Sequence, residues 1–235
     1  MRRFESFEDE TGRGTFISPG LRIGVELGFP PRPISAGELD KHLHGGDATT
    51  PKANGMRGLT RGVHNCCLEP NSGPGTIYGR LKQRLHYGSQ EEGSLLLREI
   101  DSHLKDGGTP EVHWWDMEFF GNGPNKGKAI IIDCCTGDDR DYHARRQLFD
   151  ALPTIDPFVE ETEVANVISK FPVWDSEKAF PMYEQMKERY FAYAKEGKEN
   201  EYLWEGVVTN WVKAPHELTR KQSDNLQMQT KNRFR

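Results

Sequence analysis

Hydrophobic and polar residues alternate with a helical period in two stretches of this chain. Residues 89–108 begin with a Ser-Gln-Glu-Glu sequence at capping-box spacing and end on a double glycine. Between these signals, apolar residues recur at helical spacing: Leu96, Leu97, Ile100 and Leu104. Residues 175–198 carry a longer helical pattern, with Asp175 or Ser176 as the expected cap. We expect one amphipathic helix in each stretch.

Other stretches are dense in aromatic and β-branched residues, which is typical of strands. The expected strands are residues 111–121, 127–137, 163–171, 202–212 and 225–234. Short strands are expected across 59–79, a helix across 139–151, and a short helical turn that Ser35 caps. The pattern predicts an α+β fold of antiparallel sheets flanked by helices. Residues 1–48, rich in Gly and Pro, are expected to form an irregular lead-in packed on a domain of residues 49–235.

Composition narrows the class of protein. The 235 residues are 35% hydrophobic, enough to bury a core, and they contain no long apolar run. The N-terminus is charged and lacks the apolar segment of a secretory signal, so we expect a cytoplasmic monomer without a membrane span. The net charge of -5 excludes a surface that is basic all over, but it allows a local basic patch.

The four cysteines form two adjacent pairs, Cys66-Cys67 and Cys134-Cys135. Neither pair has the two-residue gap of zinc knuckles, and His64 is the only obvious additional ligand. We therefore expect reduced, mostly buried thiols and no zinc site.

A candidate nucleophile lies at Lys52, which is followed by Ala53, Asn54 and Gly55. This spacing predicts a tight turn that presents one amine at a fixed place. A solvated lysine in a surface turn is the simpler alternative for such a short pattern. Further acidic residues lie inside the apolar runs of the predicted strands: Asp116, Glu118, Asp133 and Glu205.

Five short motifs, taken together and in order, resemble those of the covalent nucleotidyltransferases: ATP-dependent DNA ligases, RNA ligases and mRNA capping enzymes. The motifs are KANGMR at 52–57, DMEFF at 116–120, IIID at 130–133, EGVV at 205–208 and QTKNRF at 229–234. The resemblance runs from about residue 15 to the end of the chain. Within the family, the chain resembles the compact bacterial and phage DNA ligases. It implies a ligase adenylation domain, ATP-grasp-like in its nucleotide-binding fold.

The resemblance also implies roles for individual residues. Lys52 would attack the α-phosphorus of ATP and retain AMP, with Arg57 and Lys231 as catalytic cations beside it. Mg²⁺ or Mn²⁺ would be bound by Glu205 and Glu118, of which Glu118 would also accept hydrogen bonds from the ribose. The residues expected to bind the nucleotide are Thr50, Lys52, Arg57, Arg80, Glu118, Ile132 and Lys231.

Some positions depart from the family pattern. Met117 stands for a glycine, Ile132 for an aromatic residue that would meet adenine, and Asn210 and Gln229 for lysines. We expect a phosphate site that is less cationic than usual. No segment of the chain fits the OB-fold lobe that commonly follows the adenylation domain, so we expect a minimal ligase, a shortened form of a longer protein, or a ligase whose clamp a partner protein supplies.

The expected substrate is a nicked DNA duplex, as in DNA repair and replication, sealed through AMP transfer to a 5′-phosphate. Phosphate contacts carry no information about the sugar, so an RNA ligase remains an alternative, as does a non-catalytic nucleic-acid-binding relative. A capping enzyme is less favoured. Basic residues near the end of the chain are expected to contact the nucleic acid: Lys213, Arg220, Lys221, Arg233 and Arg235.

Overall fold

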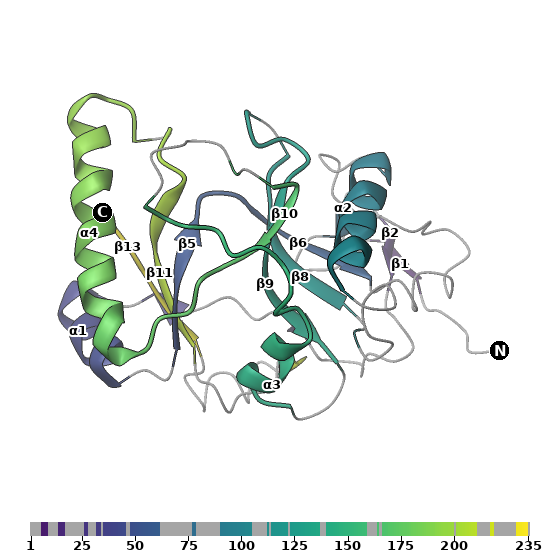
Figure 1. The fold of residues 1–235 in the computed structure, drawn as a ribbon, viewed down its shortest axis with the longest axis horizontal. Coiled ribbons are helices and arrows are strands. Elements are labelled where there is room, and N and C mark those ends of the chain that lie inside the picture. Colours follow the sequence, from purple (N-terminus) through teal and green to yellow (C-terminus); the bar gives the residue numbers. More distant parts are fainter. Residues whose placement is uncertain are drawn as a thin grey trace.

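The structure of this protein is a computed structural model. The described residues are 6–8, 14–16, 26–27, 32–33, 35–45, 48–61, 77–78, 90–104, 112, 114–121, 123–136, 140–158, 164, 166–199, 201–210, 217–218 and 229–234. They form helices and strands arranged as two main sheets with helices packed against them (Figure 1). None of the described helices is both long and apolar enough to cross a membrane.

The larger sheet has five strands in the order β10-β9-β8-β6-β7. Its members are β6 (Met56–Arg61), β7 (Ile77–Tyr78), β8 (Trp114–Phe119), β9 (Ala129–Cys135) and β10 (Ile168–Lys170). All neighbours are antiparallel except β9 and β10, which run parallel. The aromatic and β-branched runs predicted as strands at 111–121 and 127–137 are therefore confirmed in β8 and β9, whereas the run predicted at 163–171 forms a strand only at Ile168–Lys170, in β10.

The second sheet has four strands in the order β4-β13-β11-β5. These are β4 (Arg32–Pro33), β5 (Ala48–Ala53), β11 (Trp204–Asn210) and β13 (Gln229–Arg233). The pairings of β11 are antiparallel, whereas β13 and β4 run parallel. The prediction of purely antiparallel sheets is thus wrong in detail, since each main sheet gains one parallel strand at its edge. Two short antiparallel ribbons complete the described strands: β1 (Ser6–Glu8) with β2 (Gly14–Phe16), and β3 (Glu26–Leu27) with β12 (Glu217–Leu218).

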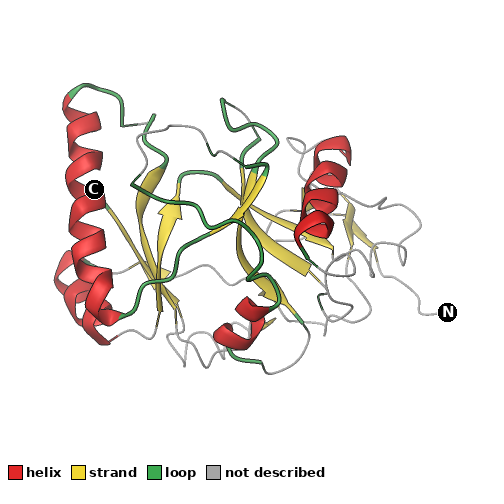
Figure 2. Ribbon diagram, in the orientation of Figure 1, coloured by secondary structure: helices red, strands yellow, loops and turns green. Residues whose placement is uncertain are grey.

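Two helices pack against the four-stranded sheet (Figures 1 and 2). They are α1 (Ala36–Gly45) and α4 (Ser176–Lys195). Of the two expected caps of α4, Asp175 is the one observed, and its side chain accepts a hydrogen bond from the Lys178 amide at 3.0 Å. Ser35 precedes α1, and its amide donates to the Glu38 carboxylate at 3.0 Å, the return bond of a capping box. The short turn expected after Ser35 is a helix of ten residues.

The five-stranded sheet is accompanied by α2 (Gln90–His103) and α3 (Tyr142–Gln147). Helix α2 confirms the amphipathic pattern, since Leu96, Leu97 and Ile100 are buried. Helix α3 is shorter than the expected stretch 139–151: after residue 147 the chain continues as turns to Ala151.

The apolar side chains form two cores. The α4 core joins α1, α4, the four-stranded sheet and Ile130 of β9, and its members include Trp174, Trp204, Tyr183, Tyr202 and Phe234. The α2 core covers the five-stranded sheet and includes Leu96, Ile100, Trp115, Met117 and Phe119. Because side chains alternate along a strand, Asp116 and Glu118 lie on the face of β8 that the α2 core does not cover. The candidate chemistry lies on this face.

Candidate active site

Lys52 lies at the point where the chain passes from one main sheet to the other. It is the last but one residue of β5 in the four-stranded sheet, and β6 of the five-stranded sheet begins only four residues later, after Ala53, Asn54 and Gly55. The predicted turn is present, but Lys52 itself is on the strand and not in the turn. Its neighbour Ala53 packs in the α4 core, so the Lys52 side chain points to the other face and is 17% exposed.

A β-bulge in β11 brings Glu205 to Lys52. Trp204 pairs with Ala53 and Gly206 pairs with Lys52, so Glu205 is the additional residue. Trp204 and Val207 both pack in the α4 core although they are three residues apart. The bulge thus turns Glu205 toward the face of Lys52, and its Oε1 contacts the Lys52 Nζ.

Glu205 also contacts a second cation. The Arg233 Nη2 on β13 lies 3.2 Å from the same Oε1, so the two positive groups share one carboxylate oxygen. The Phe234 amide donates to the Glu205 carbonyl at 3.1 Å, which fixes the bulge against the end of β13. The sequence predicts that Arg233 contacts nucleic acid. In the structure it contacts Glu205, the carboxylate that also binds Lys52.

Glu118 is the second carboxylate of the site. It lies on β8 directly opposite Arg57 on β6, and its Oε1 accepts a hydrogen bond from the Gly55 amide at 3.0 Å. The side chain is only 8% exposed. Burial raises the pKa of Glu118 to about 7, although the positive charges of Lys52 and Arg57 and the Gly55 hydrogen bond lower it.

The raised pKa of Glu118 makes the stability of the protein depend on pH. Between about pH 4.5 and about pH 7 the folded state binds more protons than the unfolded state, so the free energy of unfolding falls as the pH rises. The contribution is about 3 kcal/mol over this window. Glu118→Gln removes the titration and keeps an acceptor for Gly55. In urea unfolding, we expect the variant to gain on the wild type by up to that amount from pH 5 to pH 8; a constant difference would contradict the assignment.

Gly55 leaves no room for a side chain. A Cβ at this position would lie 2.9 Å from the Glu118 Cγ, 3.0 Å from the Phe120 ring and 3.1 Å from the Phe119 carbonyl oxygen. We expect Gly55→Ala to lower the free energy of unfolding by about 1–3 kcal/mol, because the Glu118 side chain and the β8 backbone must shift. Asn54→Ala, one residue away and exposed, is the matched control in the same denaturation experiment. Equal stability of the two variants would show that the structure accommodates a Cβ at position 55 without cost.

Arg57 is oriented by Asp116. The Arg57 Nε donates to Asp116 Oδ1 at 2.8 Å, and Nη2 contacts Oδ2, so the pair is bidentate. Asp116 is fully buried and Arg57 is 18% exposed. Burial alone would lower the pKa of Arg57, but the attraction and hydrogen bonds of Asp116, with contributions from Glu118 and Asp133, raise it above its ordinary value. Arg57 therefore stays cationic beside Glu118 and Lys52.

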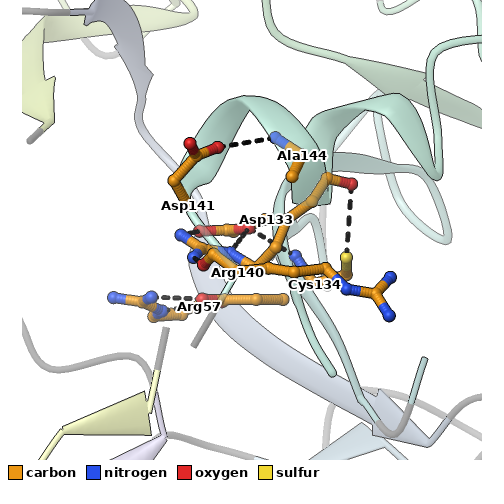
Figure 3. A network of polar contacts seen from close by, with 8 residues as sticks. Arg57, Asp133, Cys134, Arg140, Asp141 and Ala144 are labelled. Carbon is orange, nitrogen blue, oxygen red and sulfur yellow. Dashed lines mark hydrogen bonds and ion pairs between the residues drawn. The ribbon is translucent and has the colours of Figure 1, made fainter. Parts of the chain in front are cut away.

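A second bulge, in β9, determines where the IIID motif points. Asp133 pairs with Asp116 and Ile131 pairs with Met117, which leaves Ile132 as the additional residue. Ile131 and Cys134 both pack in the α2 core, so Ile132 and Asp133 lie together on the other face. Ile132 is half-buried against the α4 core, and Asp133 forms a buried ion pair with Arg145 of α3 (Figure 3).

Two partners of the site were missed by sequence reasoning. Asp116 was recognised as part of a motif, but its bond to Arg57 was not predicted. The bond forms because the two residues are diagonal neighbours on the paired strands β6 and β8. Arg145 gave no signal in the sequence, because it lies in a short helix among other basic residues. A buried arginine opposite a strand carboxylate can be recognised only once α3 is placed against β9.

The remaining predicted residues are placed only in part. Thr50 is buried on β5, two residues before Lys52, and pairs with Val208. Lys231 on β13 also pairs with Val208, so strand β11 lies between its backbone and β5. The other predicted site residues lie outside the part of the chain that the structure describes: Arg80, Lys213, Arg220, Lys221 and Arg235.

Among the described residues, no group of three or more His, Cys, Asp or Glu side chains is arranged to hold a metal ion. Cys134 is a free, buried thiol, as expected, and burial raises its pKa well above the ordinary value. Cys66, Cys67 and His64 lie outside the described residues.

Comparison with known proteins gives similarity at the level of solved structures. No family model and no curated protein matches the sequence. Two structures of an archaeal ATP-dependent RNA ligase, form 1 and form 2, are each 14% identical and align with TM-scores of 0.47 and 0.49, covering 91% and 99% of this chain. A chain named Pmar-Lig_Pre. is 15% identical, with a TM-score of 0.47 over 82% of this chain. The protein spans 57%, 58% and 44% of these three chains. Its function therefore has to be inferred from the residues of the site.

Proposed function

We propose that this protein is a covalent nucleotidyltransferase of the ligase type that takes AMP from ATP onto Lys52. The observation that carries the proposal is the convergence of Lys52, Glu205, Glu118 and Arg57 from strands of two different sheets. These four residues come from three motifs that are far apart in sequence, and each has the residue type that the resemblance requires. A solvated surface lysine would not need two buried or half-buried carboxylates around it.

The proposed first step is an attack by the neutral Lys52 amine. The Nζ lone pair forms a bond to the α-phosphorus, the bond from that phosphorus to the bridging oxygen breaks, and pyrophosphate leaves with the electron pair. The nitrogen loses one proton to solvent and keeps the other, and AMP remains as a phosphoramidate. Among the described residues, Arg57 lies beside Glu118 and Arg233 beside Glu205, so both cations can compensate the negative charge of the phosphates next to Lys52. We therefore assign Arg233 to the nucleotide site, where its charge compensates in part for the lysines that are absent at positions 229 and 210.

The carboxylates of the site fit a divalent cation in part. Mg²⁺ or Mn²⁺ is commonly bound by one or two carboxylates together with nucleotide phosphates, so a cluster of three protein ligands is not required. Glu205, 14% exposed and already beside the amine, suits this role. Glu118 suits it less, because its raised pKa and its bond to Gly55 favour hydrogen bonding to ribose hydroxyls instead. When bound, the metal would neutralise charge on the triphosphate.

The proposed overall reaction is the sealing of a nicked polynucleotide, with DNA as the first substrate to test. AMP would pass from Lys52 to the 5′-phosphate, and the adjacent 3′-hydroxyl would displace it and form the phosphodiester bond. The basic residues Lys213, Arg220, Lys221 and Arg235 would contact backbone phosphates. An RNA ligase remains the alternative, because contacts to backbone phosphates carry no information about the sugar.

The test has two stages. Incubation with α-labelled ATP and Mg²⁺ should leave acid-stable AMP on the protein, and added pyrophosphate should remove it. Nicked duplexes with DNA or RNA on either side of the nick then identify the substrate by the rate of sealing. A folded protein that takes up no label would instead be a non-catalytic relative, and labelling without sealing of any duplex would limit the proposal to the first step.

A further inference from the structure

Two buried carboxylates face each other at the edge of the site. Asp116 and Asp133 are directly opposed on β8 and β9, and they are 0% and 2% exposed. Like charges at opposed positions of neighbouring strands destabilise a sheet, and buried carboxylates need a partner. The arrangement is stable only if positive charge reaches both residues.

Each carboxylate has an arginine of its own, from a different element. Asp116 is paired with Arg57 of β6, and Asp133 is paired with Arg145 of α3, whose Nε and Nη2 donate to Oδ1 and Oδ2 at 2.9 Å each. The Cys134 amide adds a third bond to Asp133 at 2.7 Å. The two aspartates and the two arginines together carry no net charge. They extend from Arg57, opposite Glu118 of the site, to Arg145 of α3.

Arg145 is itself fixed in place by α3. The Asp141 carboxylate caps the helix by accepting from the Ala144 amide at 2.8 Å, and the Arg145 Nη1 donates to the Arg140 carbonyl (Figure 3). The Arg145 carbonyl accepts from the Cys134 thiol at 3.6 Å. The Arg145 side chain is 3% exposed. Its guanidinium is therefore pre-organised on Asp133 and does not depend on solvent.

We propose that Arg145 is a positioning residue for Arg57: by neutralising Asp133, it leaves Arg57 bound to Asp116 alone and aligned with Glu118 and Lys52. Without the Arg145 charge, Arg57 is drawn toward two buried carboxylates and turns away from the nucleotide. The effect on catalysis rests on the proposed function, whereas the effect on the Arg57 side chain does not.

The experiment reads both effects. Protein labelled with ¹⁵N-arginine gives an Nε–H signal for Arg57, assigned with Arg57→Lys. In Arg145→Met we expect this signal to shift and to exchange faster with water. We also expect the KM for ATP in AMP loading to rise about tenfold or more, because the guanidinium is misplaced. Arg145→Gln, which keeps an N–H donor for Asp133 and removes only the charge, should show the same changes and replaces Arg145→Met if that variant does not fold.

Two further variants separate positioning from general stability. Asp133→Asn with Arg145→Met removes both partners, so it should restore the Arg57 signal and most of the AMP loading. Lys170→Met removes another ion pair of the same sheet, between the buried Lys170 and the exposed Asp150, and should leave the Arg57 signal unchanged. An unchanged Arg57 signal in both single Arg145 variants, or a double variant as impaired as the single ones, overturns the inference. If the wild type takes up no AMP while the Arg57 signal responds as expected, only the proposed function fails.

Discussion

Lys52→Ala and Lys52→Arg are both expected to abolish the attachment of AMP, with label on the protein falling to background. Alanine removes the attacking nitrogen, and the arginine guanidinium stays protonated at any working pH, so neither side chain can form the phosphoramidate. Arginine retains a cation beside Glu205, so this variant should fold as the wild type does. The measurement is protein-bound AMP after incubation with α-labelled ATP, with circular dichroism as the test of folding.

Lys195→Arg is the control for this pair, since Lys195 is exposed at the end of α4 and belongs to none of the motifs. It should load AMP at the wild-type rate. Full labelling of either Lys52 variant would place the nucleophile on another residue, and the contact between Lys52 and Glu205 would then be a structural ion pair.

Glu205→Gln is expected to slow AMP loading by about two decades, or about 3 kcal/mol. The substitution keeps the shape of the side chain but removes the charge that Lys52 and Arg233 share. If Glu205 also binds the divalent cation, the Mg²⁺ concentration for half-maximal loading should rise. Loading rates measured over a series of Mg²⁺ concentrations report both effects.

The control is Glu184→Gln, which removes a carboxylate paired with Lys187 on the surface of α4. Its loading rate and Mg²⁺ dependence should match the wild type, because an exposed helix pair contributes little. A Glu205 variant that loses rate but keeps its Mg²⁺ dependence would assign Glu205 to the orientation of Lys52 alone. One that keeps both would remove it from the site.

The order of the motifs along the chain and the residue types within them were available from the sequence, and they selected Lys52, Arg57, Glu118 and Glu205. The structure brings these four side chains together. What the sequence could not supply is their geometry, because each contact joins strands that are far apart in the chain. Lys52 and Glu205, for example, are separated by 153 positions.

The local patterns determined most of the secondary structure. The apolar spacing of α2, the Asp175 cap of α4 and the aromatic run of β8 each follow from neighbouring residues, and each is found where it was expected. The parallel direction of β4 and β10 was not foreseen, since the direction of a strand depends on how the connecting chain returns to the sheet.

By itself, the sequence determined the α+β class and the chemical inventory of the site: one lysine before a turn, and carboxylates on strands. Only the tertiary structure decided which face those residues occupy. The bulges at Glu205 and Ile132 each shift the alternation of side chains by one, because a strand that takes an additional residue repeats one face before it continues. In this way Glu205 contacts Lys52, and Asp133 lies opposite Asp116. The charge of Asp133 is neutralised by Arg145, which comes from a helix that contains none of the motifs.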